Sequence, residues 1–257
     1  MTGDRDRVLA FLRDFAVRTA GRVEELTFGV ALFNDELPQV RDLNYAWIDG
    51  VPPGLDAAGL AGELDRVQGR AGLEHRKALS PDERGGDRLA PGLRELGWRT
   101  ERHLLMAHRR APDRASDLNS VTEVGEDEIR ALSEAGLRSD TAWFSEEAIR
   151  QITAQKQVVA AAGARFFAVM LGSTVATGCD LYSDAGIAQV ESVITLEEYR
   201  NRGFGRAVVL KAITEARAAG AELVFLLAEE DDWPKELYRK LGFDAMGTLH
   251  VFMRPPP

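Results

Sequence analysis

A repeated pattern limits most strongly how this chain can fold. Leu96-Gly97-Trp98 precedes the apolar segment Leu104-Leu105-Met106, and 145 positions later Leu241-Gly242-Phe243 precedes Leu249-His250-Val251. Each copy is expected to contain the end of a helix, a glycine that stops it and a strand, because glycine readily adopts the left-handed conformation at a helix end. With 257 residues, the chain is long enough for two ordinary domains. The spacing predicts two related units in tandem.

A second pair of segments supports the repeat. Asp56-Ala-Ala-Gly59-Leu-Ala61 aligns with Arg200-Asn-Arg-Gly203-Phe-Gly205 at an offset of 144, and a helical pattern follows each segment. Between the copies, proline, charged and small residues replace the apolar periodicity, which is typical of a linker. We therefore predict a first domain at residues 1–110, a linker at 111–119 and a second domain at 120–257.

The second half has the pattern of a mixed α/β domain. Helices are expected at residues 127–135, 145–156 and 207–220, with Ser145 as an N-cap, and a last helix is expected between Pro234 and Gly242. Strands are expected at residues 121–124, 165–171, 174–182, 186–195 and 222–228. In the first half, the apolar segments 26–33 and 103–107 are expected to be strands.

Composition excludes several classes of protein. Hydrophobic residues make up 45% of the chain and charged residues 28%, so a folded core is expected rather than disorder. The apolar runs are too short for a membrane helix, and the mixed-charge start of the chain does not resemble a secretory signal, which favours the cytoplasm. A net charge of −9 argues against a nucleic-acid partner. One cysteine, Cys179, and four scattered histidines predict no metal site and a buried, unreactive thiol.

The most informative segment is residues 193–208, where a strand, a loop with two glycines and the start of a helix follow one another. Backbone N–H groups at a helix start, together with the helix dipole, favour an anionic phosphate, and glycine lets the ligand approach the main chain. The glycine spacing is neither the Walker nor the Rossmann pattern. Alone, it also fits glycines that serve only a tight turn.

The wider context resembles a known family. Arg200-x-x-Gly203-x-Gly205, followed about 30 residues later by Leu237-Tyr238-Arg-Lys-Leu-Gly242-Phe243, resembles the acyl-CoA signature and closing helix of the GCN5-related N-acetyltransferase (GNAT) superfamily. The resemblance covers residues 120–254. It implies an α/β fold with a mixed α+β sheet, present as two tandem GNAT-like acyl-CoA N-acyltransferase folds. This architecture resembles that of mycothiol synthase-like tandem proteins of actinobacteria.

The resemblance also implies a function. It implies an N-acetyltransferase that moves the acetyl group of acetyl-CoA to a small-molecule amine by direct attack in a ternary complex, without a metal. The alternative is a non-catalytic acyl-CoA-binding or regulatory protein. The first copy is expected to be degenerate, because Asp56 replaces Arg200, Leu93 replaces Tyr238, and a carboxylate would repel a pyrophosphate. The sequence leaves the oligomeric state open.

Site residues carry over by position. The pantetheine contacts are expected on Val193 and Thr195, and Arg206 either adds a charge contact to a phosphate or is a solvated helix-face residue. The pyrophosphate contacts are expected on Arg200, Asn201, Arg202, Gly203, Phe204 and Gly205.

Two residues are candidates for acid and base. Tyr238 matches the family tyrosine that protonates the leaving thiolate, or it is a packed ring beside the coenzyme. Glu191 is the candidate base, or an ordinary solvated strand residue; strand alternation predicts that Gln189, Glu191 and Val193 share one face. Trp143 lies in the region where relatives line the acceptor pocket, although a lone Trp is more often a core residue.

Overall fold

The computed structural model of the chain describes residues 3–139 and 144–256, which form two compact units. The N-terminal unit consists of Arg5–Leu105, Ala228–Asp232 and Met246–Pro257, and the C-terminal unit of Met1–Asp4, Met106–Leu227 and Trp233–Ala245. Two long strands, β5 (Arg99–His108) and β11 (Phe243–Arg254), therefore have residues in both units. The division of roles between a degenerate domain 1–110 and a catalytic domain 120–257 stays a prediction. Among the described helices, none is both long and apolar enough to cross a membrane.

The N-terminal unit contains a mixed sheet in the order β1–β2–β3–β4–β11. Only β3 and β4 are parallel. Buried leucines from two helices, Leu60 and Leu64 of α2 and Leu89 and Leu93 of α3, belong to its core. The bounds of these elements, with the first helix, are α1 Asp4–Thr19, β1 Arg22–Leu26, β2 Gly29–Phe33, β3 Tyr45–Ile48, α2 Ala57–Arg70, β4 Arg76–Ser80 and α3 Glu83–Glu95.

The single strand predicted at residues 26–33 is wrong. β1 ends at Leu26 and β2 begins at Gly29, and these two residues face each other across a tight hairpin. A Cβ atom at Gly29 would lie 1.9 Å from the carbonyl oxygen of Trp47. The predicted strand therefore hides a turn, which separates β1, with half-buried and exposed residues, from β2, which is buried throughout. The strand predicted at 103–107 lies within β5.

The C-terminal unit confirms the predicted order of strands and helices. Its strands run in the order β10–β9–β8–β7–β6, and only β9 and β10 are parallel. Ser145 caps α5, with its hydroxyl oxygen accepting from the backbone N–H of Ala148 at 3.1 Å. The bounds are β6 Val121–Val124, α4 Glu126–Ser139, α5 Glu146–Ala161, β7 Arg165–Leu171, β8 Thr174–Asp184, β9 Ile187–Thr195, α6 Phe204–Ala218, β10 Leu223–Glu229 and α7 Pro234–Lys240.

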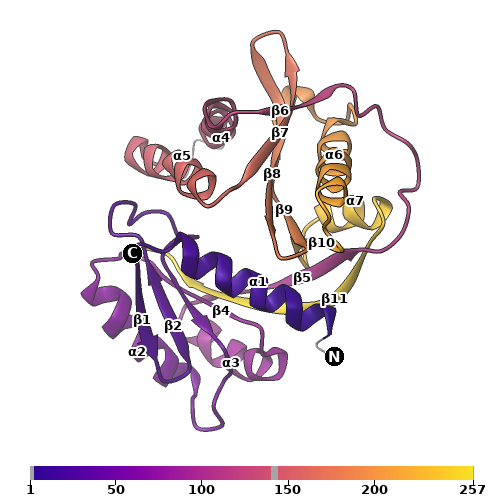
Figure 1. The fold of residues 1–257 in the computed structure, drawn as a ribbon. Helices are drawn as coiled ribbons and strands as arrows, with labels where there is room; N and C mark the ends of the chain where they lie inside the picture. Colours follow the sequence, from indigo (N-terminus) through magenta and orange to yellow (C-terminus); the bar gives the residue numbers. More distant parts are fainter. Residues whose placement is uncertain (1–2, 140–143, 257) are drawn as a thin grey trace. The chain divides into compact units, whose positions relative to one another are not determined.

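Helices cover both faces of β7–β9 in this unit (Figure 1). On one face α4 lies so close that a Cβ atom at Gly178 would come within 2.6 Å of the side chain of Ile129. On the other face the thiol of Cys179 donates to the carbonyl oxygen of Val208 in α6 at 3.6 Å. Neighbouring residues of β8 thus belong to different sides of the sheet, with α4 and α5 on one side and α6 on the other.

The repeated Leu-Gly-aromatic segments have the predicted conformation. α3 and α7 each end just before the motif, Gly97 and Gly242 have φ angles of +80° and +97°, and a strand follows in both copies. Their surroundings differ. A Cβ atom at Gly97 would meet nothing within 4 Å, whereas one at Gly242 would lie 2.0 Å from the carbonyl oxygen of Arg110. Gly242 is therefore required both for its backbone angle and for close packing.

This contrast predicts unequal effects for the same substitution. Gly97→Ala should lower the free energy of unfolding by about 1 kcal/mol, the cost of a left-handed alanine. Gly242→Ala should lower it by about 3 kcal/mol or more, since backbone must also move away from the new methyl group. Urea denaturation of both variants measures the difference, and equal losses would contradict the packing argument.

Candidate active site

The parallel strands β9 and β10 separate soon after they meet. They pair at only three positions, Ile187 with Leu223, Ala188 with Val224 and Gln189 with Phe225, in the described part of the chain. β9 is buried up to Val190 and half-buried from Glu191 to Thr195. The second half of β9, which contains Val193 and Thr195, thus has a backbone edge that β10 leaves open. An extended ligand could pair with such an edge as an added strand.

A β-bulge interrupts β9 beside this open edge. Asp180 of β8 pairs with Glu191, but two residues further back Gly178 pairs with Ile194, so β9 contains one extra residue. Ser192 within the bulge has a φ of +52°. The predicted common face of Gln189, Glu191 and Val193 is therefore wrong beyond Glu191. The register places Ile194 on the face of Glu191, because the inserted residue reverses the alternation.

The loop that follows β9 ends in a helix start without a side-chain cap. Gly203 is the N-cap of α6 in the left-handed conformation, with a φ of +83°, and no side chain of the described residues caps the first turn. A Cβ atom at Gly203 would meet nothing within 4 Å, while one at Gly205 would lie 3.3 Å from the hydroxyl of Thr195. Gly205 lets α6 approach β9, and Gly203 shapes the loop. The first-turn N–H groups suit an anion.

The other predicted loop residues have separate positions. Arg200 donates from Nε to the carbonyl oxygen of Thr195 at 3.3 Å, which ties the loop to β9. Asn201 is left-handed, with a φ of +62°. The guanidinium of Arg202 lies 5.0 Å from the ring centre of Phe204, the first residue of α6. Both arginines are exposed, and so are Glu197 and Glu198 of the same loop.

Arg206 is not a solvated helix-face residue, which was one of the two alternatives expected from the sequence. Its side chain is buried, and the guanidinium lies 2.7 Å from the carboxylate of Asp113. It also donates to the carbonyl oxygen of Arg114 at 3.4 Å. The linker region supplies both partners, which a sequence reading of α6 alone could not reveal. A contact of Arg206 with a phosphate stays a prediction.

The corresponding helix start in the N-terminal unit is closed by its own side chain. Asp56 is the N-cap of α2, and its carboxylate accepts from the N–H of Gly59 at 2.8 Å. Gly59 thus lies inside the helix, whereas Gly203 precedes one, so the predicted alignment of these glycines is wrong by three residues. Asp56 itself stands at the position of Gly203.

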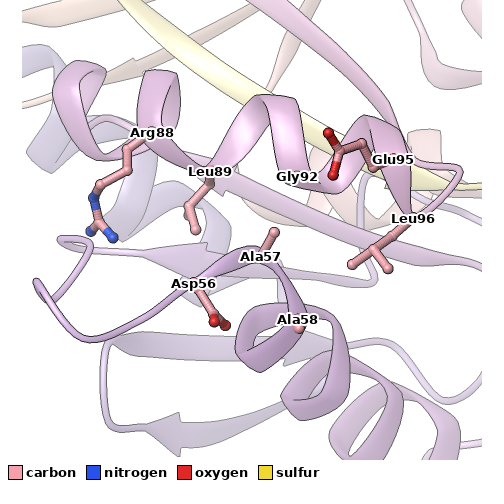
Figure 2. A pocket seen from close by; sticks show the side chains of 8 residues that line it. All are labelled: Asp56, Ala57, Ala58, Arg88, Leu89, Gly92, Glu95 and Leu96. Carbon is pink, nitrogen blue, oxygen red and sulfur yellow. The ribbon is translucent and has the colours of Figure 1, made fainter.

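A pocket of about 340 Å³ lies beside this start, between α2 and α3 (Figure 2). Arg88 of α3 extends to the loop before α2 and donates to the carbonyl oxygens of Leu55 and Pro52 at 2.7 and 2.8 Å. The loop is thus held by a guanidinium, and the helix start by a carboxylate. The Asp56 carboxylate thus takes up an N–H group that an anion would otherwise accept from, and the degenerate role of the first copy stays a prediction.

A buried charged cluster faces α5 beside the bulge, and the sequence did not predict it. Asp180 is fully buried, and its Oδ2 lies 2.6 Å from Nζ of Lys156 and accepts from the hydroxyl of Tyr182 at 2.8 Å. Burial raises the pKa of Asp180. Glu191 accepts from the amide of Gln189 at 2.5 Å. The one sequence signal for this cluster was Lys156, a charged residue within the apolar pattern of the helix predicted at 145–156.

The remaining predicted residues are buried or lie outside the described part. Tyr238 of α7 is 9% exposed and packs edge-to-face on Phe243, with ring centres 6.2 Å apart. Cys179 is fully buried, and burial raises the pKa of its thiol, in agreement with the expectation of an unreactive side chain. Trp143 lies outside the described residues.

Comparison with known proteins identifies the family of this site. Residues 122–243 match the model of the acetyltransferase (GNAT) family. The chain contains a GNAT domain. A 64-residue segment is 28% identical to an uncharacterized N-acetyltransferase, CgeE of Bacillus subtilis (strain 168), and it covers 25% of this chain and 25% of that protein.

Solved structures extend the similarity to both units. A GCN5-related N-acetyltransferase from Kribbella flavida covers 100% of this chain and 98% of its own, with a TM-score of 0.62 and 21% identity. A tandem GNAT protein from the clavulanic acid biosynthesis pathway covers 100% and 97%, with a TM-score of 0.56 and 13% identity. A conserved protein of unknown function from Staphylococcus epidermidis ATCC 12228 covers 93% of this chain and 95% of its own, with a TM-score of 0.66 and 15% identity. The predicted tandem GNAT fold is confirmed.

The buried pair in the GNAT domain yields a stability prediction. Lys156→Met should lower the free energy of unfolding at pH 7 by about 3 kcal/mol or more, because Asp180 is left as a buried charge without its cation. A carboxyl with a raised folded-state pKa loses stability as pH rises through that pKa. The deficit should therefore shrink as pH falls from 8 to 5 and Asp180 takes up a proton.

The matched control is Lys211→Met, which removes one of two partners of Glu215, 2.8 Å away in a partly exposed pair on α6, and leaves Arg165 as the other. Its effect should stay below about 1 kcal/mol at every pH. Denaturation curves at several pH values measure both variants. A Lys156→Met deficit that is small, or independent of pH, would contradict a buried ionised pair.

Proposed function

We propose that this chain is an N-acetyltransferase that transfers the acetyl group of acetyl-CoA to a small-molecule amine by direct attack in a ternary complex. One observation carries the proposal. The open edge of β9, from Glu191 to Thr195, is followed by a short loop that contains the 3-10 helix Glu197–Tyr199 and then by the uncapped start of α6 at Gly203. An extended arm and an anionic diphosphate, joined as they are in coenzyme A, match an open strand edge followed by a helix start.

In this proposal the loop binds the diphosphate and β9 binds the pantetheine arm. The backbone N–H groups of the first turn of α6 donate to the diphosphate, with positive charge from Arg200 and Arg202, and Asn201, Phe204 and Gly205 complete the loop. Val193 and Thr195 bond to the arm through their backbone. The thioester then lies near the bulge at Ser192.

The chemistry requires a base and an acid. The amine nitrogen forms a bond to the carbonyl carbon, the C–S bond breaks, and the nitrogen loses one proton while the sulfur gains one. Glu191, half-buried on the face that carries Asp180, is proposed to accept the proton of the amine. Tyr238 is proposed to donate its proton to the leaving thiolate.

A second function, acyl-CoA binding without catalysis, is favoured by one observation. Tyr238 is 9% exposed and packs on Phe243, which also suits a ring that only supports the coenzyme site. The two functions differ in whether the chain releases free thiol from acetyl-CoA in the presence of amines. Steady-state thiol release with a panel of amines therefore distinguishes an enzyme from a binding protein.

Coenzyme binding should involve one site per chain. Gly203→Val should weaken acetyl-CoA binding about tenfold or more, because a branched side chain strains the left-handed loop and crowds the anion. Gly220→Val is the matched control, since Gly220 follows the C-cap of the same helix with a φ of +91° and open space around it. Calorimetry measures both affinity and stoichiometry. Two equivalent sites would overturn the degenerate role of the first copy, and no binding would overturn the proposed function.

Tyr238→Phe should reduce turnover more than coenzyme binding. Loss of a general acid should lower kcat by a factor on the order of 10², with the KM for acetyl-CoA nearly unchanged. The alkaline limb of the kcat profile should also change. Tyr45→Phe, at another buried tyrosine, is the control. An unchanged kcat and alkaline limb would remove Tyr238 from the chemistry and leave the thiolate to depart without a protein acid.

A further inference from the structure

Residues 109–113 are bonded to the end of α7. The backbone N–H groups of Arg109 and Arg110 both donate to the carbonyl oxygen of Gly242, at 2.9 and 3.1 Å. The backbone N–H of Asp113 donates to the carbonyl oxygen of Lys240 at 2.8 Å. The guanidinium of Arg110 also pairs with Asp244 at 2.8 Å. The two segments are closely packed here, because even a methyl group at Gly242 would collide with the carbonyl oxygen of Arg110.

The same segment is bonded to the start of α6 through Asp113. The carboxylate of Asp113 lies 2.7 Å from the guanidinium of Arg206, the third residue of α6. The Arg206 side chain is 5% exposed, whereas that of Asp113 is 45% exposed. A guanidinium buried to this extent needs a charged partner, since an unpaired buried ion is strongly unfavourable. Asp113 thus holds α6 with its carboxylate and α7 with its backbone N–H.

We propose that Asp113 is a positioning residue of the coenzyme site, and that it sets the separation between α6 and α7. This inference rests on the proposed function, in which α6 begins with the diphosphate loop and α7 carries Tyr238. A single linker residue then fixes the loop that binds the diphosphate against the helix that carries the acid. The residues 109–113 act from outside the site and touch no reacting atom.

The test uses Asp113→Asn, which removes the ion pair and keeps the N–H that bonds to Lys240. The kcat/KM for acetyl-CoA should fall about tenfold, because the loop is no longer held in place relative to α7. The kcat/KM for S-acetylpantetheine, which lacks the diphosphate, should change less than twofold. A purely structural defect would lower both values equally, so the ratio of the two substrates reports positioning.

Three further measurements complete the design. Asp113→Glu should recover at least half of the lost kcat/KM, because it restores the carboxylate. Asp117→Asn, in the same linker region, should leave both substrates unchanged, since the Asp117 carboxylate accepts only from the nearby N–H of Asn119 at 3.0 Å in the described structure. Thermal unfolding shows whether each variant folds. If Asp113→Asn does not fold, Arg206→Lys replaces it in the test, because lysine keeps the positive charge but has a shorter side chain.

The outcomes separate this inference from the function on which it rests. Equal losses for both substrates, no loss, or tighter binding of acetyl-CoA by Asp113→Asn would overturn the positioning role; tighter binding would mean that Asp113 competes with the coenzyme for Arg206. Wild-type protein that neither binds nor turns over acetyl-CoA would overturn the proposed function, and this inference with it.

Discussion

The separation of β9 from β10 beyond Gln189 is the constraint on which the candidate site depends. Parallel neighbours normally satisfy each other's backbone groups along their whole length. Here the pairing ends after three positions, and the bulge at Ser192 then changes the register of the half-buried part of β9 with β8. The open edge, the position of Glu191 and the approach to α6 all follow from these two departures from regular pairing. Gly203 and Gly205 then shape the loop after β9 and the start of α6.

The two helix starts show how little change separates an uncapped helix start from a capped one. α2 and α6 occupy corresponding places in the repeat, and both begin after a loop. In α2 the N-cap is Asp56, whose carboxylate accepts from the N–H of Gly59, and in α6 it is Gly203, which has no side chain to offer. Helix capping by a carboxylate typically contributes about 1 kcal/mol. The N-terminal unit gains that stability, whereas the start of α6 has no such side-chain cap.

Local patterns were predictable because they depend on neighbours in sequence. The strand at 165–171, the cap at Ser145 and the glycine stops at 97 and 242 all have the predicted place, since turn and cap chemistry acts over a few residues.

Features that were missed involve an inserted residue or distant partners. Alternation cannot reveal the bulge at Ser192, because one extra residue leaves no mark in the apolar pattern. The pairs of Lys156 with Asp180 and of Arg206 with Asp113 join residues 24 and more than 90 positions apart. A charged residue within a helical pattern does not show which distant residue is its partner.

The burial of Cys179 has a practical consequence for work on this chain. It is the one cysteine in the sequence, its sulfur lies beneath α6, and burial raises the pKa of the thiol. Thiolate is the form that reacts with disulfide dyes and alkylating agents. In a mixture with folded protein, such a dye will therefore report any thiol released from acetyl-CoA, with little background from the protein itself. The same dye will begin to count one thiol per chain when the C-terminal unit unfolds, so one reagent can follow both turnover and loss of structure.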